Sequence, residues 1–269
     1  VVLTEGRREP GGRVPLESAL PGLIEWRRVV DWRLTQVNKT PNIFMYPSSQ
    51  MTAADVLEAG PRHVMLATGS TWRRDGIGRY LSRPAQGSGN IFTPDDLMNG
   101  KLPSGIIIIY DDDHYYMGGV LAELLANNGC KVTLITPAPI VAYWTQFTLE
   151  QGRIQKRLMQ LDVTLLPNHA LASHTPTTAT VTHTITSAES TLACDAVVMV
   201  ADSIPNDALY HELKPALANG RLASLRLIGD AEAPGIIAQA VYSGHLAARE
   251  FDEDINRDET PFRVERVIT

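Results

Sequence analysis

Apolar runs typical of buried strands alternate along the chain with segments whose apolar positions recur at helical spacing. Val1–Thr4 is a short β-run, and the loop that follows contains Pro10, Gly11 and Gly12. From Glu17 to Val37, apolar residues mark one face of a helix while Arg27, Arg28, Asp31 and Arg33 occupy much of the other. This pattern predicts an amphipathic helix that Pro21 can interrupt. A strand at Ile43–Tyr46, a short helix after Thr52 and a strand at His63–Ala67 follow.

The middle of the chain predicts a strand, helix, strand unit. Residues 73–105 are rich in Gly, Pro, Ser and Asn and form a long connection, with one short helix at Pro94–Met98. Ile106–Tyr110 is an entirely apolar strand, Gly118–Asn128 is a helix, and Lys131–Thr136 is the next strand. The further predicted elements are a helix that carries Phe147, Ile154, Leu158 and Leu161, strands at Val163–Leu166, Ala196–Val200 and Leu225–Ile228, a hairpin arm at Ala179–Thr186, and a helix at Ile236–Phe251.

This order of elements favours a doubly wound α/β architecture, because parallel strands need crossover helices between them. Two domains fit the pattern, one inserted into the other. Residues 1–100 plus 201–269 are predicted to form the outer domain, and residues 101–200 the inserted one.

Composition and charge narrow the function classes. The chain has 269 residues and a formal net charge of -6, so it offers a nucleic acid no long-range attraction. No apolar run approaches the ~20 residues of a membrane span, and nothing marks an oxidising compartment; the expected location is the cytoplasm. Cys130 and Cys194 are too few for a Cys-rich zinc or iron-sulfur site, and the seven histidines lack ligand spacing. We therefore expect no metal site, and because no Ser nucleophile elbow occurs either, we expect no catalytic residue in this chain.

Three strand ends carry side chains suited to a nucleotide. Glu5 follows the first strand, where a carboxylate can accept hydrogen bonds from a ribose diol. Ala67-Thr68-Gly69 ends another strand, where small residues let the backbone approach a phosphate. Gly229-Asp230 ends a third, with a helix beyond it whose positive end favours phosphate. Each feature taken singly is also typical of an ordinary tight turn; the set in this order predicts a nucleotide site.

The turn after Ile106–Tyr110 stands where a second G-x-G-x-x-G turn would occur, and most of its glycines are missing. Asp113 and Tyr115 occupy positions where backbone should approach a pyrophosphate, and three adjacent carboxylates repel phosphate at short range. We predict that the inserted domain does not bind NAD(P)H. A metal site built from residues 111–114 is a less favoured alternative, because consecutive residues at a strand end rarely converge on one ion.

Several segments together resemble the C-terminal half of the trimethylamine dehydrogenase and histamine dehydrogenase family, to which the 2,4-dienoyl-CoA reductases are more distantly related. The resemblance covers nearly the whole chain. The segments that carry it are EGRREPGGRV, LPGLIEWRRVVDWRLTQVNK, MTAADVLEAGPRHVMLATGS, MGGVLAELLANNGCKVTLIT and LIGDAEAPGIIAQAVYSGHLAARE.

The resemblance implies a multidomain flavoenzyme. Its parts are an old yellow enzyme type of barrel with covalent FMN, a [4Fe-4S] cluster, and two glutathione-reductase-like domains of the FAD/NAD(P)-binding, Rossmann type. In this chain the first of those domains would hold ADP, or the ADP moiety of FAD. The residues predicted to contact it are Glu5, Gly12, Arg13, Ala67, Thr68, Gly69, Gly229 and Asp230.

The same resemblance implies partners and an activity. We expect oxidative C-N cleavage of a small amine, electron transfer to electron-transferring flavoprotein or a similar acceptor, and a homodimer. The degenerate turn at Asp111–Tyr116 favours this branch over NADPH-dependent enzymes. Two alternatives stay open: an NAD(P)H-dependent flavin oxidoreductase resembling 2,4-dienoyl-CoA reductase, and a noncatalytic nucleotide-binding or docking module.

One departure from the family concerns the start of the chain. The family's first β-strand and its G-x-G-x-x-G turn should directly precede Val1, and the chain has no initiator Met. The barrel, the flavin-linking Cys and the cluster cysteines are also absent from this sequence. We expect a fragment whose missing segment is supplied by further sequence or a second chain, because a sheet without its central strand leaves internal edges unpaired.

Overall fold

The computed structural model describes residues 1–251. The chain divides into two compact units. Unit 1 comprises Val1–Thr52 and Ser70–Ile204, and unit 2 comprises Ala53–Gly69 and Pro205–Thr269. The predicted assignment of residues 1–100 plus 201–269 to one domain and 101–200 to the other stays a prediction, and residues 252–269 lie outside the described part.

A five-stranded parallel sheet forms the centre of unit 1. Its strands, in spatial order, are β6 (Ile91–Phe92), β13 (Ala196–Val200), β7 (Ile106–Asp111), β8 (Lys131–Thr136) and β9 (Thr164–Pro167). The central strand β7 is apolar from Ile106 to Tyr110 because both of its faces are covered, as is usual for parallel sheets.

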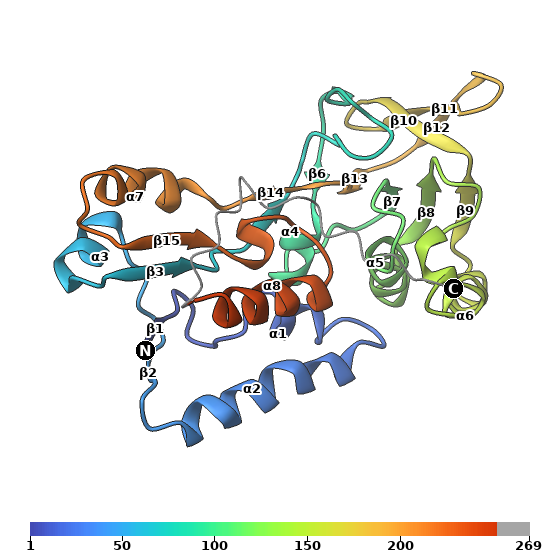
Figure 1. Cartoon of the computed structure of the whole chain (residues 1–269). Helices are drawn as coiled ribbons and strands as arrows, with labels where there is room; N and C mark the ends of the chain where they lie inside the picture. The colour runs from blue at the N-terminus through green and yellow to red at the C-terminus, as the bar shows by residue number, and fades with distance from the viewer. Residues whose placement is uncertain (252–269) are drawn as a thin grey trace, which may run out of the picture. The chain divides into compact units, whose positions relative to one another are not determined.

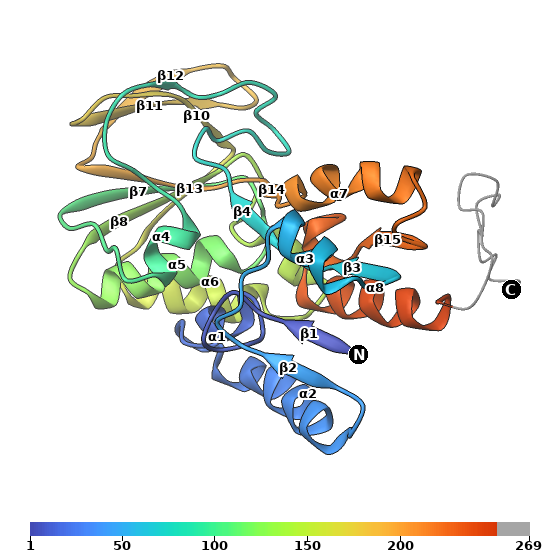
Figure 2. The same cartoon turned by 90° about the vertical axis from the view of Figure 1, so that its left-hand side faces the viewer.

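Alternate residues of β7 belong to two different cores. Ile107 and Ile109 pack in one core with Leu121 of α5 (Met117–Asn127), whereas Ile108 and Tyr110 pack in the other with residues of the second sheet. Figure 2 shows these layers in unit 1: helices α4 (Pro94–Met98), α5 and α6 (Gln151–Gln160) lie on one side of the parallel sheet, and strands β10–β12 on the other. The second sheet has the order β12 (Glu189–Ala193), β11 (Thr178–His183), β10 (His169–His174) and β5 (Gln86–Gly87).

The N-terminal part of unit 1 pairs β1 (Val2–Thr4) with β2 (Phe44–Tyr46) in parallel. The helical pattern after Glu17 is interrupted rather than continuous. Helix α1 (Val14–Glu17) ends where the predicted helix begins, and the 3-10 turn η1 (Ile24–Trp26) and α2 (Arg27–Lys39) follow. Pro21 and Gly22, which has a φ of +76°, turn the chain between α1 and η1. Unit 1 also contains η2 (Tyr143–Gln146), and β4 (Ser70–Trp72) pairs with β14 (Ser203–Pro205).

Unit 2 is built around the parallel pair β3 (His63–Leu66) and β15 (Ser224–Leu227), visible in Figure 1 with α3 and α7 beside it. Leu213 and Ala216 of α7 (Ala208–Ala218) are buried in one core with Val64 and Leu225. The remaining elements of unit 2 are α3 (Ala53–Ala59), η3 (Gly229–Ala231) and α8 (Ile237–Arg249).

The prediction of two glutathione-reductase-like domains is wrong. The described residues form an α/β fold with parallel sheets, as the alternation of elements predicts, but the strands assigned to the outer domain do not join into one doubly wound sheet. Instead β1 pairs only with β2, and β3 only with β15, among residues 1–251. The pattern of apolar residues predicts that a strand forms, whereas long-range pairing decides which sheet it joins.

Among the helices within residues 1–251, none combines the length and the apolar character that crossing a membrane requires.

Candidate functional site

Two of the predicted turns leave the same edge of the sheet in unit 2. Strands β3 and β15 are parallel, with Leu66 opposite Leu227, and the N–H of Ile228 donates to the carbonyl of Leu66 at 3.0 Å. The Ala67–Gly69 turn and the Gly229–Asp230 turn therefore begin side by side at the carboxyl ends of neighbouring strands, where open parallel α/β sheets bind their ligands.

The turn at Ala67–Gly69 is fixed by Asn206, which precedes α7. The Thr68 hydroxyl donates to the carbonyl of Asn206, the N–H of Asn206 donates to the carbonyl of Gly69 at 2.9 Å, and its side-chain amide donates to the carbonyl of Thr68 at 3.2 Å. Gly69 has a φ of +76°, and no atom lies within 4 Å of the position that a Cβ would take. Three hydrogen bonds thus hold the turn, with open space in front of Gly69.

The turn at Gly229–Asp230 is tied to the helix that follows. Gly229 has a φ of +60°, and its N–H donates to the Ser243 hydroxyl of α8 at 3.0 Å. That hydroxyl donates to the Glu232 carboxylate at 3.0 Å, and the Asp230 carboxylate accepts the N–H of Gly235 at 3.2 Å. These bonds hold the turn against α8, whose N-terminal end carries a partial positive charge.

The other predicted contacts lie in unit 1. Glu5 accepts the N–H of Arg7 at 2.8 Å through its carboxylate, and its own N–H donates to the carbonyl of Tyr46 at 3.0 Å. Gly12 has a φ of +62° with open space at its Cβ position. The Nε of Arg13 lies 3.0 Å from a carboxylate oxygen of Glu17. The predicted joint contact of Glu5, Gly12 and Arg13 with the turns of unit 2 stays a prediction.

The buried Glu17 and the partly buried Tyr116 form a polar pair that the sequence patterns do not indicate. Glu17 is 0% exposed, and the Tyr116 hydroxyl donates to its second carboxylate oxygen at 2.8 Å. Burial and the nearby Glu17 charge raise the pKa of Tyr116, and Trp26 packs edge-on against its ring with centroids 4.6 Å apart. The spacing of four residues between Arg13 and Glu17 could have indicated the ion pair, but nothing local indicates Tyr116.

The turn between β7 and α5 contains a fully buried carboxyl group. Asp111 is 0% exposed, and one of its oxygens accepts the N–H of His114 at 3.0 Å. Its other oxygen is buried without a hydrogen-bond partner among residues 1–251. Burial, and to a lesser degree the charge of Asp113, raises the pKa of Asp111 to about 7. A Cβ on Gly118 of α5 would lie 2.6 Å from the Asp111 carboxyl carbon, so the two residues pack in direct contact.

Asp112 binds a loop from another part of unit 1. Its carboxylate accepts the N–H of Tyr80 at 3.0 Å and the N–H of Leu81 at 3.3 Å, and the Nε2 of His114 lies 3.3 Å from it. Burial raises the pKa of the neighbouring Asp113, while Arg79 acts in the opposite direction. Within the described residues, no three His, Cys, Asp or Glu side chains are grouped so that they could hold a metal ion.

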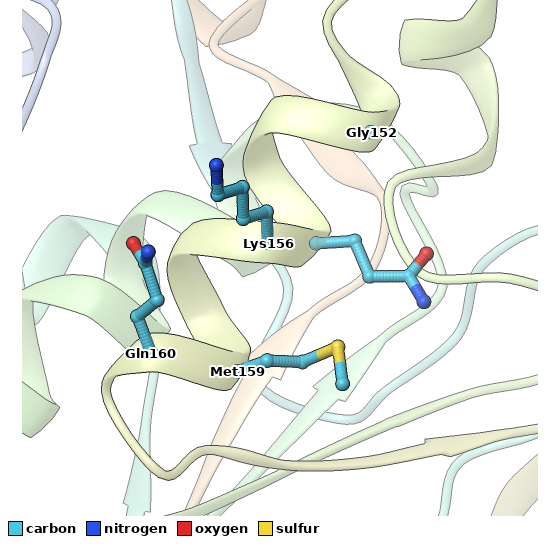
Figure 3. A pocket seen from close by; sticks show the side chains of 5 residues that line it. Gly152, Lys156, Met159 and Gln160 are labelled. Carbon is cyan, nitrogen blue, oxygen red and sulfur yellow. The ribbon is translucent and has the colours of Figure 1, made fainter.

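Two hollows occur on unit 1. One, of about 250 Å³, is lined by Gly78, Arg79, Asp113, Ala201 and Asp202 at the carboxyl ends of β7 and β13. The other, of about 490 Å³, lies along α6, where Figure 3 shows Lys156, Met159 and Gln160 on the same helix. Because residues of α6 alone line it, the second hollow does not bring groups from different elements together.

Comparison with known proteins identifies relatives over the whole chain. Residues 92–182 match the family model described as OYE-like second alpha/beta domain. Dimethylamine dehydrogenase from Hyphomicrobium sp. (strain x) is 30% identical over 306 residues, which cover 99% of this chain and 40% of that protein.

Solved structures give the same result. Histamine dehydrogenase from Rhizobium sp. 4-9 matches with a TM-score of 0.93 and 42% identity over 98% of this chain and 42% of that one. The 6-hydroxypseudooxynicotine amine oxidase from Pseudomonas geniculata N1 matches with a TM-score of 0.91 and 38% identity over 94% of this chain and 38% of that one. The chain therefore spans about two fifths of the length of these relatives.

These matches replace the prediction of two glutathione-reductase-like domains, since the fold follows histamine dehydrogenase and includes the OYE-like second α/β domain. They confirm the family resemblance of the sequence segments. The chain belongs to the OYE-like family of trimethylamine dehydrogenase type that contains dimethylamine dehydrogenase and histamine dehydrogenase.

Proposed function

We propose that this chain is the nucleotide-binding, electron-transfer part of an amine dehydrogenase, an oxidoreductase that acts on C-N bonds. The observation that carries the proposal is the match to dimethylamine dehydrogenase, histamine dehydrogenase and an amine oxidase over 94% or more of the chain. The matched proteins are more than twice as long, so the site of amine oxidation is assigned to the part that this chain does not span.

FMN and the [4Fe-4S] cluster are likewise assigned to the part of the protein that this chain does not span. A [4Fe-4S] cluster usually needs four cysteine ligands, and Cys194 is buried while Cys130 donates to the carbonyl of Pro103. The cysteines of this chain do not fit a cluster, so FMN and the cluster are assigned to the other part of the protein. FMN would accept the electrons of the amine there.

ADP, or the ADP moiety of FAD, is proposed for the strand ends of unit 2, and the geometry of the two turns supports it. The open space in front of Gly69 admits a ligand close to the backbone. Thr68 and Gly69 would line the pyrophosphate, and Gly229 and Asp230 would close the site, with Ala67 as the remaining contact in unit 2. Glu5, Gly12 and Arg13 of unit 1 stay contacts predicted from the sequence. On family grounds, electron-transferring flavoprotein or a similar protein is the proposed acceptor, and a homodimer the proposed assembly.

A pair of glycine variants in unit 2 tests the ADP site. Gly69→Ala and Gly220→Ala impose the same strain, because φ is +76° at Gly69 and +77° at Gly220, and neither Cβ would meet an atom within 4 Å. Only Gly69 lies at the proposed site. With the full-length protein freed of nucleotide, calorimetric titration with ADP should show affinity at least about tenfold weaker for Gly69→Ala and unchanged for Gly220→Ala. Equal affinities for both variants would contradict the proposal that ADP binds at these turns.

The activity is tested by the visible spectrum of the full-length protein. We expect flavin and cluster absorption, with bleaching of the flavin band on anaerobic addition of dimethylamine or histamine. Bleaching by NADPH and not by any amine would favour the alternative of an NAD(P)H-dependent reductase. Absence of both chromophores would favour the noncatalytic docking module.

A further inference from the structure

The β7–α5 turn occupies the position in the five-stranded sheet where a ligand is expected. The strand order places β8 and β9 on one side of β7 and β13 on the other, so the connections that leave β7 and β13 diverge. Open parallel α/β sheets bind nucleotides in the crevice that such a divergence creates. In this chain, a hollow of about 250 Å³ lies there, and its charged lining residues are Arg79, Asp113 and Asp202.

The hydrogen-bond donors at this position are already taken by a side chain. The buried Asp112 carboxylate accepts the N–H groups of Tyr80 and Leu81, which are the kind of donors that cradle a phosphate in nucleotide-binding loops. Gly78 fits closely around this carboxylate, since a Cβ there would lie 2.6 Å from one of its oxygens. A phosphate oxygen and the Asp112 carboxylate cannot share this space.

Asp111 occupies the end of the turn that adjoins α5. Its carboxyl group contacts Gly118 in the first turn of α5, where helix N–H groups and the helix dipole would otherwise face a phosphate. One of its oxygens is buried there without a hydrogen-bond partner in the described part of the chain. Leaving this polar atom without a partner costs folding free energy.

We propose that Asp111 and Asp112 are specificity-determining residues that occupy the phosphate position of the β7–α5 turn with their own carboxyl groups. They exclude the pyrophosphate of a dinucleotide from unit 1, and removal of the Asp112 carboxylate converts the turn into a site for inorganic pyrophosphate. This goes beyond the proposed function, because it concerns unit 1 and holds whether or not ADP binds in unit 2.

Hydrogen exchange of the full-length protein tests the proposal locally. In Asp112→Ala, the amides of Tyr80 and Leu81 lose their acceptor, and their exchange should become on the order of tenfold faster. Millimolar pyrophosphate should restore slow exchange in this variant, whereas sodium chloride at equal ionic strength should not. The wild-type protein should show no change with pyrophosphate or with NADPH at residues 78–81 and 111–118.

Asp195→Ala is the matched control. The Asp195 carboxylate accepts the N–H of Ile106 at 2.7 Å and packs against Gly105, so it also caps a backbone donor, but at the opposite end of β7. Exchange at Ile106 should become faster in Asp195→Ala, and pyrophosphate should leave it fast.

Three outcomes would overturn the proposal: protection of the wild-type turn by NADPH or pyrophosphate, fast exchange in Asp112→Ala that pyrophosphate leaves unchanged, or equal restoration in Asp195→Ala. If Asp112→Ala does not fold, Asp112→Ser is assessed in the same way through the amides of Tyr80 and Leu81, because it also removes the carboxylate. Restoration by pyrophosphate in that variant supports the proposal, and its absence contradicts it.

Discussion

Glu17 and Glu25 show how burial determines the contribution of the same type of side chain to the free energy of unfolding. Glu17 is fully buried between Arg13 and Tyr116. Glu25 pairs with Arg28 at 3.0 Å, but these side chains are 68% and 82% exposed, so water and salt screen the pair.

The first prediction compares these two glutamates. Glu17→Gln removes a buried negative charge from Arg13, and breaking a buried pair in this way should lower the free energy of unfolding by about 3 kcal/mol. Glu25→Gln should change it little. Urea denaturation followed by tryptophan fluorescence measures both, and a similar small effect for the two variants would contradict the assigned burial of Glu17.

The second prediction concerns pH. The pKa of Asp111 is raised from 3.8 to about 7 by burial, so the folded state binds this proton more tightly than the unfolded chain. Its contribution is fully present below about pH 4 and is lost as the pH rises through about 7, with a magnitude on the order of 4 kcal/mol. Asp111→Asn resembles the protonated acid and should flatten the fall in stability between pH 4 and 7.

Asp75 provides a control of opposite sign. The hydrogen bond from Arg73 lowers the pKa of its carboxyl, so its contribution is present above pH 3.8 and is lost below that pH. Asp75→Asn should therefore lower the stability evenly at neutral pH and change the slope of the stability curve only at the acidic end. If Asp111→Asn and Asp75→Asn change the same pH range, the assignment of the buried proton to Asp111 is wrong.

At the scale of elements, the packing of α5 against the end of β7 depends on a glycine, Gly118, which has no side chain. Gly118→Ala would place a Cβ 2.6 Å from the buried Asp111 carboxyl, so we expect a loss of about 2 kcal/mol in the free energy of unfolding. In an Asp111→Ala background the loss should be smaller by more than about 0.5 kcal/mol, because the two residues interact directly.

Gly152→Ala is the control for helix propensity in this prediction. Gly152 is an exposed residue of α6 with no atom within 4 Å of its Cβ position, so alanine there should be neutral or stabilising by about 0.5–1 kcal/mol. Chemical denaturation of the single and double variants gives the coupling, and strictly additive effects would contradict the contact.

Several elements could be predicted from the sequence because their signals are local. The apolar runs at Lys131–Thr136 and Ala196–Val200 and the capped helix at Pro94–Met98 are confirmed with the predicted bounds. Helix α7 was missed, since Pro215 inside it weakens the helical signal. The sequence pattern does not indicate strands β10 and β12 either; each pairs with β11, and this pairing depends on residues elsewhere in the chain.

At the scale of the whole molecule, burial predicts where exchange with solvent is slowest. Strands β7 and β13 are buried along nearly their whole length, whereas β1 is exposed at every residue. Amides of β7 and β13 should therefore exchange slowest among residues 1–251 and those of β1 among the fastest, as hydrogen exchange with mass spectrometry can measure. Rapid exchange in β7 would contradict the central place of this strand.

The candidate nucleotide site could be predicted from sequence only in part. The Ala67–Gly69 and Gly229–Asp230 turns were found as strand ends, and the pairing of β3 with β15 brings them to one edge. Asn206, which fixes the first turn, and Ser243, which holds the second, were not found. Their hydrogen bonds join residues far apart in the chain, for which a local pattern holds no signal.

The sequence by itself determined the α/β class, most strands and helices, the family and the acidic character of the β7–α5 turn, because each of these depends on residues close together in the chain. Only the tertiary structure decided that β1 with β2 and β3 with β15 form separate pairs. It also decided that Asp112 binds Tyr80 and Leu81 and that Glu17 meets Tyr116. The physical reason is that sheet pairing and buried polar contacts are selected by long-range packing, in which register, shape and desolvation act together.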